Sequence, residues 1–185
     1  MANVLVPLAQ GCEELEAVTV IDLLRRAGVK VVTAGLDDQP VTASRGVVLI
    51  PDTALGEVID EAFDMVVLPG GLPGADNLNQ DPRIHILIKK MVTNNKPVAA
   101  ICAGPKVLGT AGLLDGKHAT SYPGSLEGIA IQDMEYEQQA VVVDGNVITS
   151  RGPGTAMDFA LTLIETLLGK ARRDDVEASL QRPTS

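Results

Sequence analysis

The N-terminal part of the sequence contains a strand–helix–strand pattern, which restricts the fold more than any other feature. Residues 4–9 and 29–34 are short apolar segments typical of buried strands, and residues 13–28 between them carry helical spacing. Acidic residues fill the first turn of this helix, arginines its last turn, and Gly28 follows as a stop signal. Two strands joined by a helix in so short a stretch predict a parallel sheet with a right-handed crossover.

The same alternation of strands and helices continues along the chain. Further strands are expected at residues 64–69, 97–101, 119–122, 134–137, 140–144 and 147–150. Helices are expected at residues 53–58, 81–95, 106–111, 156–168 and, more briefly, 176–180. Residues 41–51 favour a hairpin or an extended arm. The pattern therefore predicts one α/β domain spanning residues 1–185, a doubly wound and mostly parallel sheet between two layers of helices.

Composition and charge exclude several classes of function. The net charge is −9 and aromatic residues make up 2%, so a basic, base-stacking surface for nucleic acid is not expected. Two cysteines do not make a disulfide framework, which favours a reducing compartment. The first residues show no signal-peptide pattern and no apolar segment is long enough to cross a membrane, so we expect a cytoplasmic protein without membrane contact.

Cys102 stands where a buried strand is expected to turn sharply into a helix. The apolar residues 97–101 precede it, and Ala103, Gly104 and Pro105 follow. This is the arrangement of the nucleophile elbow in hydrolases, with a thiol in place of the hydroxyl. The positive end of the following helix would favour the thiolate. The alternative is a buried strand-end cysteine that acts only as a small hydrophobic residue.

Three loops are expected at the carboxyl edge of the central strands, where doubly wound folds place their sites. They comprise residues 10–16, 70–74 and 102–105. The N–H groups of Gly71 and Ala103 could hold an oxyanion there. The sequence has no spacing typical of metal ligands, phosphate-binding loops or dinucleotide sites, so we expect no metal and no cofactor.

A nucleophilic Cys102 needs a proton partner, and neither histidine is well placed. His85 falls inside a predicted helix and His118 at an exposed strand start, which disfavours a Cys-His-Asp hydrolase. Cys12, in the first loop, is interpreted as an inert loop cysteine.

A carboxyl group is the remaining candidate for the proton partner. Glu13, Glu14 and Glu16 open the first helix, and the helical pattern turns Glu16 inward. Burial would raise the pKa of its carboxyl, which could then act as general acid and base. The alternative is that all three acids only complement the helix dipole.

Four motifs together resemble the ThiJ/PfpI superfamily, in particular its YajL and parkinsonism-associated deglycase branch. They are residues 11–16, 67–71, 99–105 and 149–155, and the resemblance covers essentially the whole chain. It implies a flavodoxin-like fold, a homodimer and a protonated glutamate beside an oxidation-sensitive cysteine thiolate. Carried onto this sequence, the catalytic pair is Cys102 and Glu16 and the oxyanion donors are Gly71 and Ala103; the pocket or anion-binding residues are Arg45, Arg26, Gly70 and Tyr122.

Three departures from the superfamily pattern bear on activity. Ala103 stands where the protease and chaperone branches have a histidine after the cysteine, which argues against a peptidase. Tyr122 precedes Pro123 where a pocket histidine can occur, so a histidine-assisted step is not expected. Ile50 occupies the place of a peripheral cysteine.

Two functions remain open from the sequence. The first is a cofactor-free glyoxalase or deglycase that converts small reactive 2-oxoaldehydes such as methylglyoxal to 2-hydroxy acids and so protects against oxidative stress. The second is a redox sensor or chaperone in which oxidation of Cys102 is the signal. Both require the same reactive thiol, and turnover that needs both Cys102 and Glu16 separates them.

Overall fold

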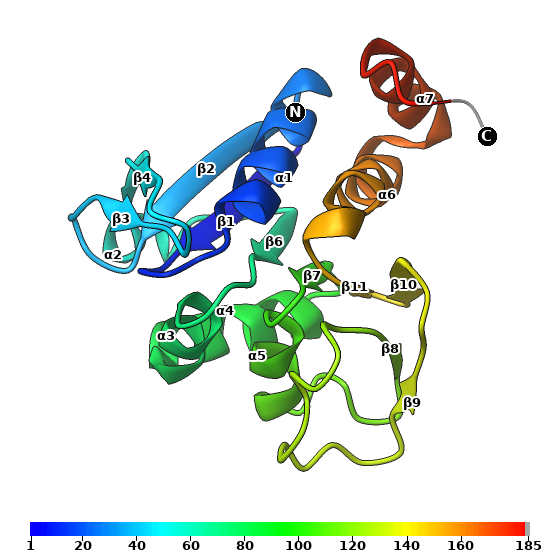
Figure 1. The fold of residues 1–185 in the computed structure, drawn as a ribbon. Coiled ribbons are helices and arrows are strands. Elements are labelled where there is room, and N and C mark those ends of the chain that lie inside the picture. The colour runs from blue at the N-terminus through cyan, green and yellow to red at the C-terminus, as the bar shows by residue number, and fades with distance from the viewer. Residues whose placement is uncertain (184–185) are drawn as a thin grey trace.

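The computed structural model describes residues 1–183 and is built around a seven-stranded central sheet (Figure 1). The strand order is β10–β11–β7–β6–β1–β2–β5, and every pair is parallel except β10 with β11. The bounds are β1 (Asn3–Leu8), β2 (Lys30–Gly35), β5 (Thr53–Ala54), β6 (Met65–Leu68), β7 (Val98–Ile101), β10 (Val141–Asp144) and β11 (Val147–Ser150). The predicted flavodoxin-like, mostly parallel α/β sheet is confirmed.

Helices cover both faces of this sheet. One face packs against α1 (Glu14–Arg26), α6 (Ala156–Leu168) and α7 (Lys170–Ser179). The other packs against α2 (Leu55–Val58), α3 (Gly74–Gln80), α4 (Pro82–Thr93) and α5 (Pro105–Thr110). Side chains of β1 alternate between the two layers, because Val4 and Val6 belong to the first cluster and Leu5 to the second. The continuous apolar strands of the sequence follow from this double coverage.

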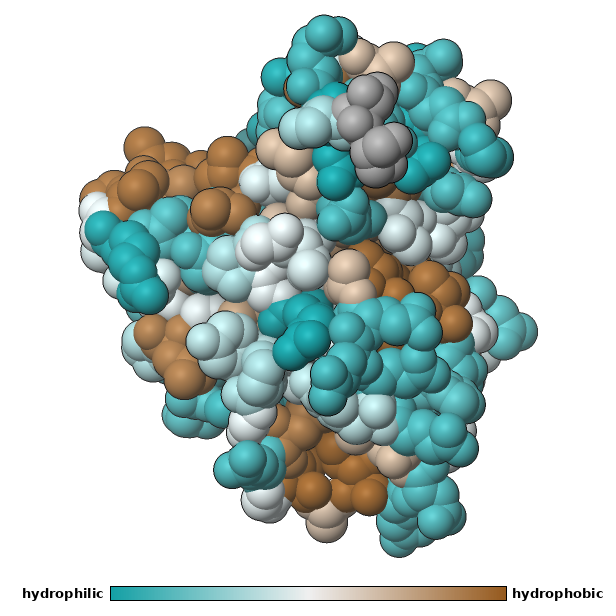
Figure 2. Space-filling view, turned by 45° about the vertical axis from the view of Figure 1, so that its right-hand side comes forward, coloured by the Kyte–Doolittle hydropathy of each residue, from teal (hydrophilic) through white to brown (hydrophobic). Residues whose placement is uncertain are grey.

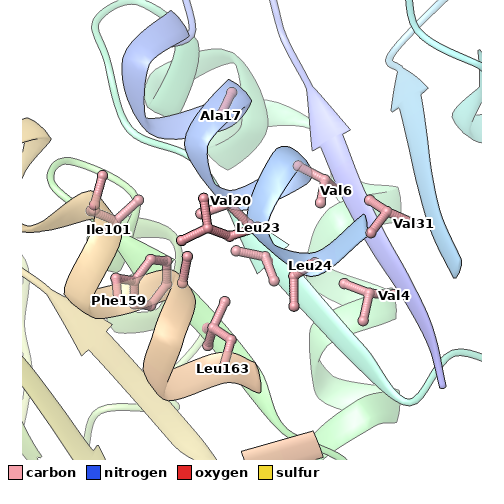
Figure 3. Close-up of a cluster of buried hydrophobic side chains, with 14 of the residues drawn as sticks. Val4, Val6, Ala17, Val20, Leu23, Leu24, Val31, Ile101, Phe159 and Leu163 are labelled. Carbon is pink, nitrogen blue, oxygen red and sulfur yellow. The ribbon is translucent and has the colours of Figure 1, made fainter. Parts of the chain in front are cut away.

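Phe159 fills the middle of the first layer (Figure 3). It lies fully buried in the cluster that Leu23 and Leu163 of the covering helices form with Ile101 of the sheet. Since aromatic residues are scarce in this chain, aliphatic side chains supply most of the remaining contacts. Removing such a ring leaves a cavity and costs about 3–5 kcal/mol in comparable cores. This layer packs α1 against α6 and the sheet.

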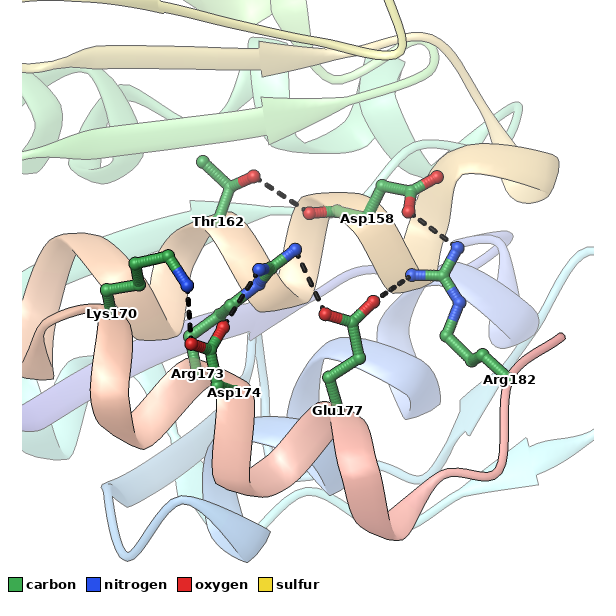
Figure 4. A network of polar contacts seen from close by, with 7 residues as sticks. All are labelled: Asp158, Thr162, Lys170, Arg173, Asp174, Glu177 and Arg182. Carbon is green, nitrogen blue, oxygen red and sulfur yellow. Dashed lines mark hydrogen bonds and ion pairs between the residues drawn. The ribbon is translucent and has the colours of Figure 1, made fainter. Parts of the chain in front are cut away.

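Two helices differ from the sequence expectation. The glycine- and asparagine-rich α3 was not predicted, because its helix propensity is poor and burial of Ala75 and Leu78 stabilises it instead. α7 begins earlier than the expected residues 176–180. An ion pair of Arg173 with Glu177 stabilises it along its own length (Figure 4). Arg182, which follows α7, pairs with both Glu177 of α7 and Asp158 of α6 and so joins the two helices.

The strand expected at 119–122 is largely wrong. Only His118 and Ala119 form β8 (His118–Ala119), which pairs with β9 (Glu135–Tyr136) outside the central sheet. The next residues bind the elbow region instead, since the N–H of Tyr122 donates to the carbonyl of Cys102 at 2.8 Å. The brief helix expected from residue 53 is preceded by β5, a short edge strand.

Residues 41–51 form a hairpin arm of β3 (Val41–Thr42) and β4 (Val48–Leu49). The carboxylate of Glu14 accepts hydrogen bonds from the hydroxyl of Ser44 and the N–H of Arg45, which fastens the tip of the arm to the start of α1. The single turn η1 (Pro153–Thr155) precedes α6. Within residues 1–183, none of the helices combines the length and apolar character needed to span a bilayer.

Candidate active site

The loops that follow β1, β6 and β7 meet at one edge of the sheet, as the strand order requires (Figure 1). The N–H of Glu13 donates to the carbonyl of Gly70 at 3.0 Å, which joins the first loop to the second. A β-carbon at Gly104 would lie 2.7 Å from the carbonyl oxygen of Leu68, so only glycine allows the third loop to approach this closely. The site is thus assembled from backbone contacts among distant segments.

Cys102 occupies a strained turn between β7 and α5. Its φ of 63° lies in the left-handed region that residues with a side chain rarely adopt. Its N–H donates to the carbonyl of Ser150 at 3.0 Å, and its side chain opens into a cavity although the residue is only 8% exposed. This is the geometry of a nucleophile elbow.

Glu16 is the fully buried member of the three acids that open α1. Its Oε2 accepts a hydrogen bond from the N–H of Gly70 at 2.9 Å, and Oε1 has no hydrogen-bond partner among the described residues. A β-carbon at Gly70 would lie 2.6 Å from Cβ of Cys102 and 2.7 Å from Oε2 of Glu16. The carboxyl and the thiol therefore meet over a residue that has no side chain.

Burial dominates the electrostatics of this pair. It raises the pKa of Glu16 from 4.5 to about 7, against the opposing hydrogen bonds of Cys102 and Gly70. Burial, followed by the charge of Glu16, raises the pKa of the Cys102 thiol to about 12. The helix N-terminus alone therefore does not make Cys102 a thiolate, because the Cys102 thiol and the Glu16 carboxyl cannot both be ionised in this buried site. A thiolate is compatible with this site only when Glu16 holds the proton.

Two backbone N–H groups oppose the effect of burial on the Cys102 thiol. Hydrogen bonding from Gly71 and Ala103 lowers the pKa of the Cys102 thiol. Gly71 has a φ of 85°, which orients its peptide group in the loop after β6. Donors placed at the sulfur are also placed near any oxygen of a carbonyl carbon that the sulfur attacks, which is the requirement for an oxyanion hole.

A cavity of about 820 Å³ opens in front of Cys102. Arg45 and Tyr122 line it, together with Lys106, whose ammonium group pairs with Asp76 at 2.6 Å. The other side chains and backbone segments around it come from Glu13, Ser44, Gly71, Leu72, Asn79, Ala103, Thr110, Pro123, Gly124, Ser125, Glu127, Gly128, Ile129 and Pro153. Among the described residues, Arg45 has no carboxylate within ion-pair distance. One nitrogen of its guanidinium donates to the carbonyl of Ser44 at 3.3 Å, and its charge remains available for an anionic group.

The placement of Arg26 in the pocket is wrong. Arg26 lies in the last turn of α1 and pairs with Asp22 at 2.7 Å. Glu16 is in the first turn of the same helix, and a rise of ~1.5 Å per residue separates the two by roughly 15 Å. Gly70 is buried beneath the cavity and contributes its N–H to Glu16 rather than to a ligand.

The other titratable candidates lie away from the cavity. The ring of His85 hydrogen-bonds the carbonyl of Asn79 at 2.8 Å, and the ring of His118 lies 2.7 Å from the carboxylate of Glu137. Neither histidine lines the cavity. Cys12 is fully buried, and burial followed by the charge of Glu14 raises the pKa of its thiol to about 11.

The side chains of Glu13 and Glu14 accept hydrogen bonds within the protein rather than simply facing water. The side chain of Glu13 accepts a hydrogen bond from the N–H of Glu16 at 2.8 Å and so caps α1. Glu14 holds the hairpin arm, as described above.

Sequence reasoning did not identify Lys106, Ser125 or Asn79 as part of the cavity wall. Lys106 could have been found, since it lies four residues after Cys102 on the helix that the elbow starts. Ser125 belongs to an irregular loop that carries no periodic signal. Within residues 1–183, no group of three or more His, Cys, Asp or Glu side chains is arranged to hold a metal ion.

Comparisons with known proteins identify the family of the chain. A model of the DJ-1/PfpI family matches residues 2–166. The Drosophila melanogaster "Protein dj-1beta" is 44% identical, with 96% of each chain covered. The Caenorhabditis elegans "Glutathione-independent glyoxalase DJR-1.2" is 37% identical over 95% of this chain and 92% of its own.

Solved structures of the same family share the fold of this chain. The structure described as "Toxoplasma gondii DJ-1, oxidized" superimposes with a TM-score of 0.93, with 39% identity and full coverage of both chains. Some relatives are longer, and this chain spans 46% of the length of "Protein DJ-1 homolog A" from Arabidopsis thaliana.

Proposed function

Because the chain belongs to the DJ-1/PfpI family, we propose that it is a cofactor-independent cysteine enzyme of the glyoxalase or deglycase type. Its substrates are small reactive 2-oxoaldehydes such as methylglyoxal, and its products are 2-hydroxy acids. The observation that carries the proposal is the buried carboxyl of Glu16 against the elbow thiol of Cys102. The name of the Caenorhabditis elegans relative supports the same reaction class.

The first step is addition of the Cys102 thiolate to the aldehyde carbon. Glu16 holds the proton at this stage, which removes the repulsion that opposes the thiolate. A carbon–sulfur bond forms, and the aldehyde oxygen takes the negative charge between the N–H groups of Gly71 and Ala103. The carboxyl of Glu16 then donates its proton to this oxygen and becomes a carboxylate.

Proton transfer by Glu16 completes the conversion. The carboxylate removes the proton from the former aldehyde carbon and returns it to the neighbouring carbon, while the proton on the former aldehyde oxygen passes to the ketone oxygen. The ketone becomes an alcohol and the adduct becomes a thioester. Water then attacks the thioester, the carbon–sulfur bond breaks and Cys102 is released. The aldehyde carbon is oxidised and the ketone carbon reduced within one molecule, so the net reaction consumes only water.

The residues around the cavity favour an enzyme that acts on small carbonyl compounds over a peptidase. Neither histidine lines it, so the imidazole base of a Cys-His hydrolase is missing from the wall. Tyr122 and the guanidinium of Arg45, which has no carboxylate partner among the described residues, supply polar groups for the second oxygen of the substrate. The volume of about 820 Å³ exceeds the needs of a three-carbon aldehyde and leaves room for adducts with amines or thiols.

The second candidate is a redox sensor. One related structure is described as oxidized, and Cys102 combines an opening to the cavity with two N–H donors near its sulfur. An oxidised sulfur with negative oxygens would be stabilised by the same donors. In this alternative, turnover is absent and the oxidation state of Cys102 is recognised by a partner.

We also propose that the chain forms a homodimer through α1 and the hairpin arm. Exposed apolar side chains gather on these elements, including Leu15, Val48 and Ile50, the last of which is 83% exposed. Figure 2 shows brown hydrophobic areas between teal polar ones on the face that it presents. Because Glu14 ties the arm to the helix, the two elements can present one surface.

Turnover of methylglyoxal by the wild-type protein and by Cys102→Ser and Glu16→Gln tests the proposed reaction. We expect lactate formation in the wild type and its loss in both variants. A wild-type protein that forms no lactate, while peroxide still oxidises Cys102 selectively, would favour the sensor.

A further inference from the structure

Ser125 lines the cavity, and its hydroxyl lies within hydrogen-bond distance of the carbonyl of Cys102 itself. Its hydroxyl has one hydrogen, which two carbonyl oxygens share, that of Tyr122 at 2.9 Å and that of Cys102 at 3.3 Å. The N–H of Tyr122 donates to the same Cys102 oxygen at 2.8 Å. Two groups from one loop therefore converge on a single carbonyl of the strained residue.

That carbonyl belongs to the same peptide unit as an oxyanion donor. The peptide joining Cys102 to Ala103 is planar, so its C=O and the N–H of Ala103 point in opposite directions. Whatever fixes the oxygen also fixes the direction of the N–H. In addition, a hydrogen bond accepted by a carbonyl polarises the peptide and strengthens the N–H as a donor.

The loop is itself closed around Ser125. The N–H of Ser125 donates to the carbonyl of Tyr122 at 3.0 Å, which forms a turn, and the hydroxyl reinforces this turn. The turn holds the N–H of Tyr122 against the elbow. Ser125 thus acts on the Cys102 carbonyl directly and through Tyr122.

We propose that Ser125 is a positioning residue that aligns the Ala103 N–H of the oxyanion hole by holding the Cys102 carbonyl. The inference rests on the proposed function for its effect on turnover, but its effect on the thiol does not. Loss of the alignment weakens a donor to the sulfur as well as to the oxyanion.

The chain offers a matched control. The hydroxyl of Ser121 donates to the carbonyl of Tyr122 at 3.0 Å, as Ser125 does, but it makes no hydrogen bond to Cys102 and does not line the cavity. Ser121→Ala therefore removes a hydroxyl from the same loop without touching the elbow.

The test compares Ser125→Thr with Ser125→Val, since the two side chains have nearly the same shape and differ in the hydroxyl. We expect Ser125→Val to lower kcat for methylglyoxal and the rate of Cys102 alkylation at fixed pH by about 3- to 10-fold, the effect of one hydrogen bond. KM should remain unchanged. Ser125→Thr and Ser121→Ala should match the wild type in both assays, and melting temperatures check that each variant is folded.

Two results would overturn the proposal. Equal behaviour of Ser125→Thr and Ser125→Val would show that the hydroxyl has no role. An equal loss in Ser121→Ala would assign the effect to the Tyr122 turn rather than to the Cys102 carbonyl. If the wild type turns over no carbonyl substrate, the proposed reaction fails, and the alkylation rates still decide the role of Ser125.

Discussion

Glu16 and Cys102 approach each other across the bare backbone of the residue between them, Gly70. A β-carbon there would lie 2.7 Å from the carboxyl oxygen of Glu16 and 2.6 Å from Cβ of Cys102, closer than non-bonded carbon atoms approach. The absence of a side chain at one position thus permits the pairing of two others.

Gly70→Ala should disrupt the site and destabilise the fold, because the new methyl group displaces either the thiol or the carboxyl. Overpacking of this kind typically costs about 1–3 kcal/mol. Gly154→Ala is the control, since a β-carbon there has no atom within 4 Å. Thermal melts and methylglyoxal turnover would measure the effects, and equal results for the two variants would contradict the steric argument.

The two cysteines should differ strongly in reactivity. Burial raises the pKa of both thiols, to about 12 for Cys102 and about 11 for Cys12, so access and partner decide the difference. Cys102 opens into the cavity and its thiol can ionise when Glu16 holds the proton, whereas Cys12 is fully buried and does not line the cavity. Limiting iodoacetamide or peroxide, followed by peptide mass spectrometry, should modify Cys102 first. Preferential modification of Cys12 would count against the elbow assignment.

Much of the fold could be predicted because the spacing of apolar residues along the sequence indicates its strands and helices. The apolar strands specified a sheet covered on both faces, and the strand-to-helix turn marked Cys102. The spacing of the first helix also turned Glu16 inward, where the structure buries it. These features depend on local sequence and on general rules for parallel sheets.

Features set by tertiary contacts could not be predicted in the same way. α3 forms because Leu78 packs into the core, although its sequence is a poor helix former. Arg26 was placed in the pocket by resemblance, whereas the length of α1 carries it away. Ser125 gave no signal, because irregular loops have no period that predicts their neighbours.

The proposed homodimer should dissociate when its apolar surface is charged. Sedimentation at micromolar concentration should give twice the chain mass of 19.4 kDa. Leu15→Glu combined with Val48→Glu should shift the protein towards a monomer, because both side chains are more than half exposed on the proposed face. Ile86→Glu is the control, since Ile86 lies exposed on α4 across the sheet. A wild-type monomer would refute the dimer.

Stability should depend on pH through Glu16. Its carboxyl is neutral in both states below pH 4.5, whereas above pH 7 the folded state must bury a charge. The contribution of Glu16 to the free energy of unfolding is therefore present below pH 4.5 and is lost as the pH rises through about 7. The loss is on the order of 3 kcal/mol, from about 1.4 kcal/mol for each unit of pKa shift.

Glu16→Gln removes the titrating carboxyl, so its stability should not depend on pH through this residue. The difference in melting temperature between Glu16→Gln and the wild type should therefore shift in favour of the variant as the pH rises. For Glu14 the pH dependence of stability should have the opposite sign, and Glu14→Gln tests it. Desolvation raises the pKa of Glu14, but hydrogen bonds from backbone N–H groups and Ser44 outweigh it and lower the pKa. Its stabilisation is therefore present at neutral pH and lost in acid. Parallel pH profiles for the two variants would contradict the burial argument.

Glu16 has two proposed roles, donor to the sulfur and carrier of protons, and its variants separate them. Glu16→Gln keeps an N–H donor but cannot transfer a proton, so thiolate formation should survive while methylglyoxal turnover falls by about 10²-fold or more. Glu16→Leu removes both functions and also the partner of the Gly70 N–H, so the Cys102 thiol should lose the stabilisation that a neutral donor gives.

Absorbance of the thiolate against pH, measured beside turnover for Glu16→Gln, Glu16→Leu and Glu14→Gln, gives both readouts. Glu14→Gln should remain close to the wild type in both, because its carboxylate faces the hairpin arm rather than the thiol. A large loss of turnover in Glu14→Gln with none in Glu16→Gln would place the proton carrier elsewhere. If all three variants retain turnover, the carboxyl–thiol pair is not catalytic, and oxidation of Cys102 becomes the better explanation of the site.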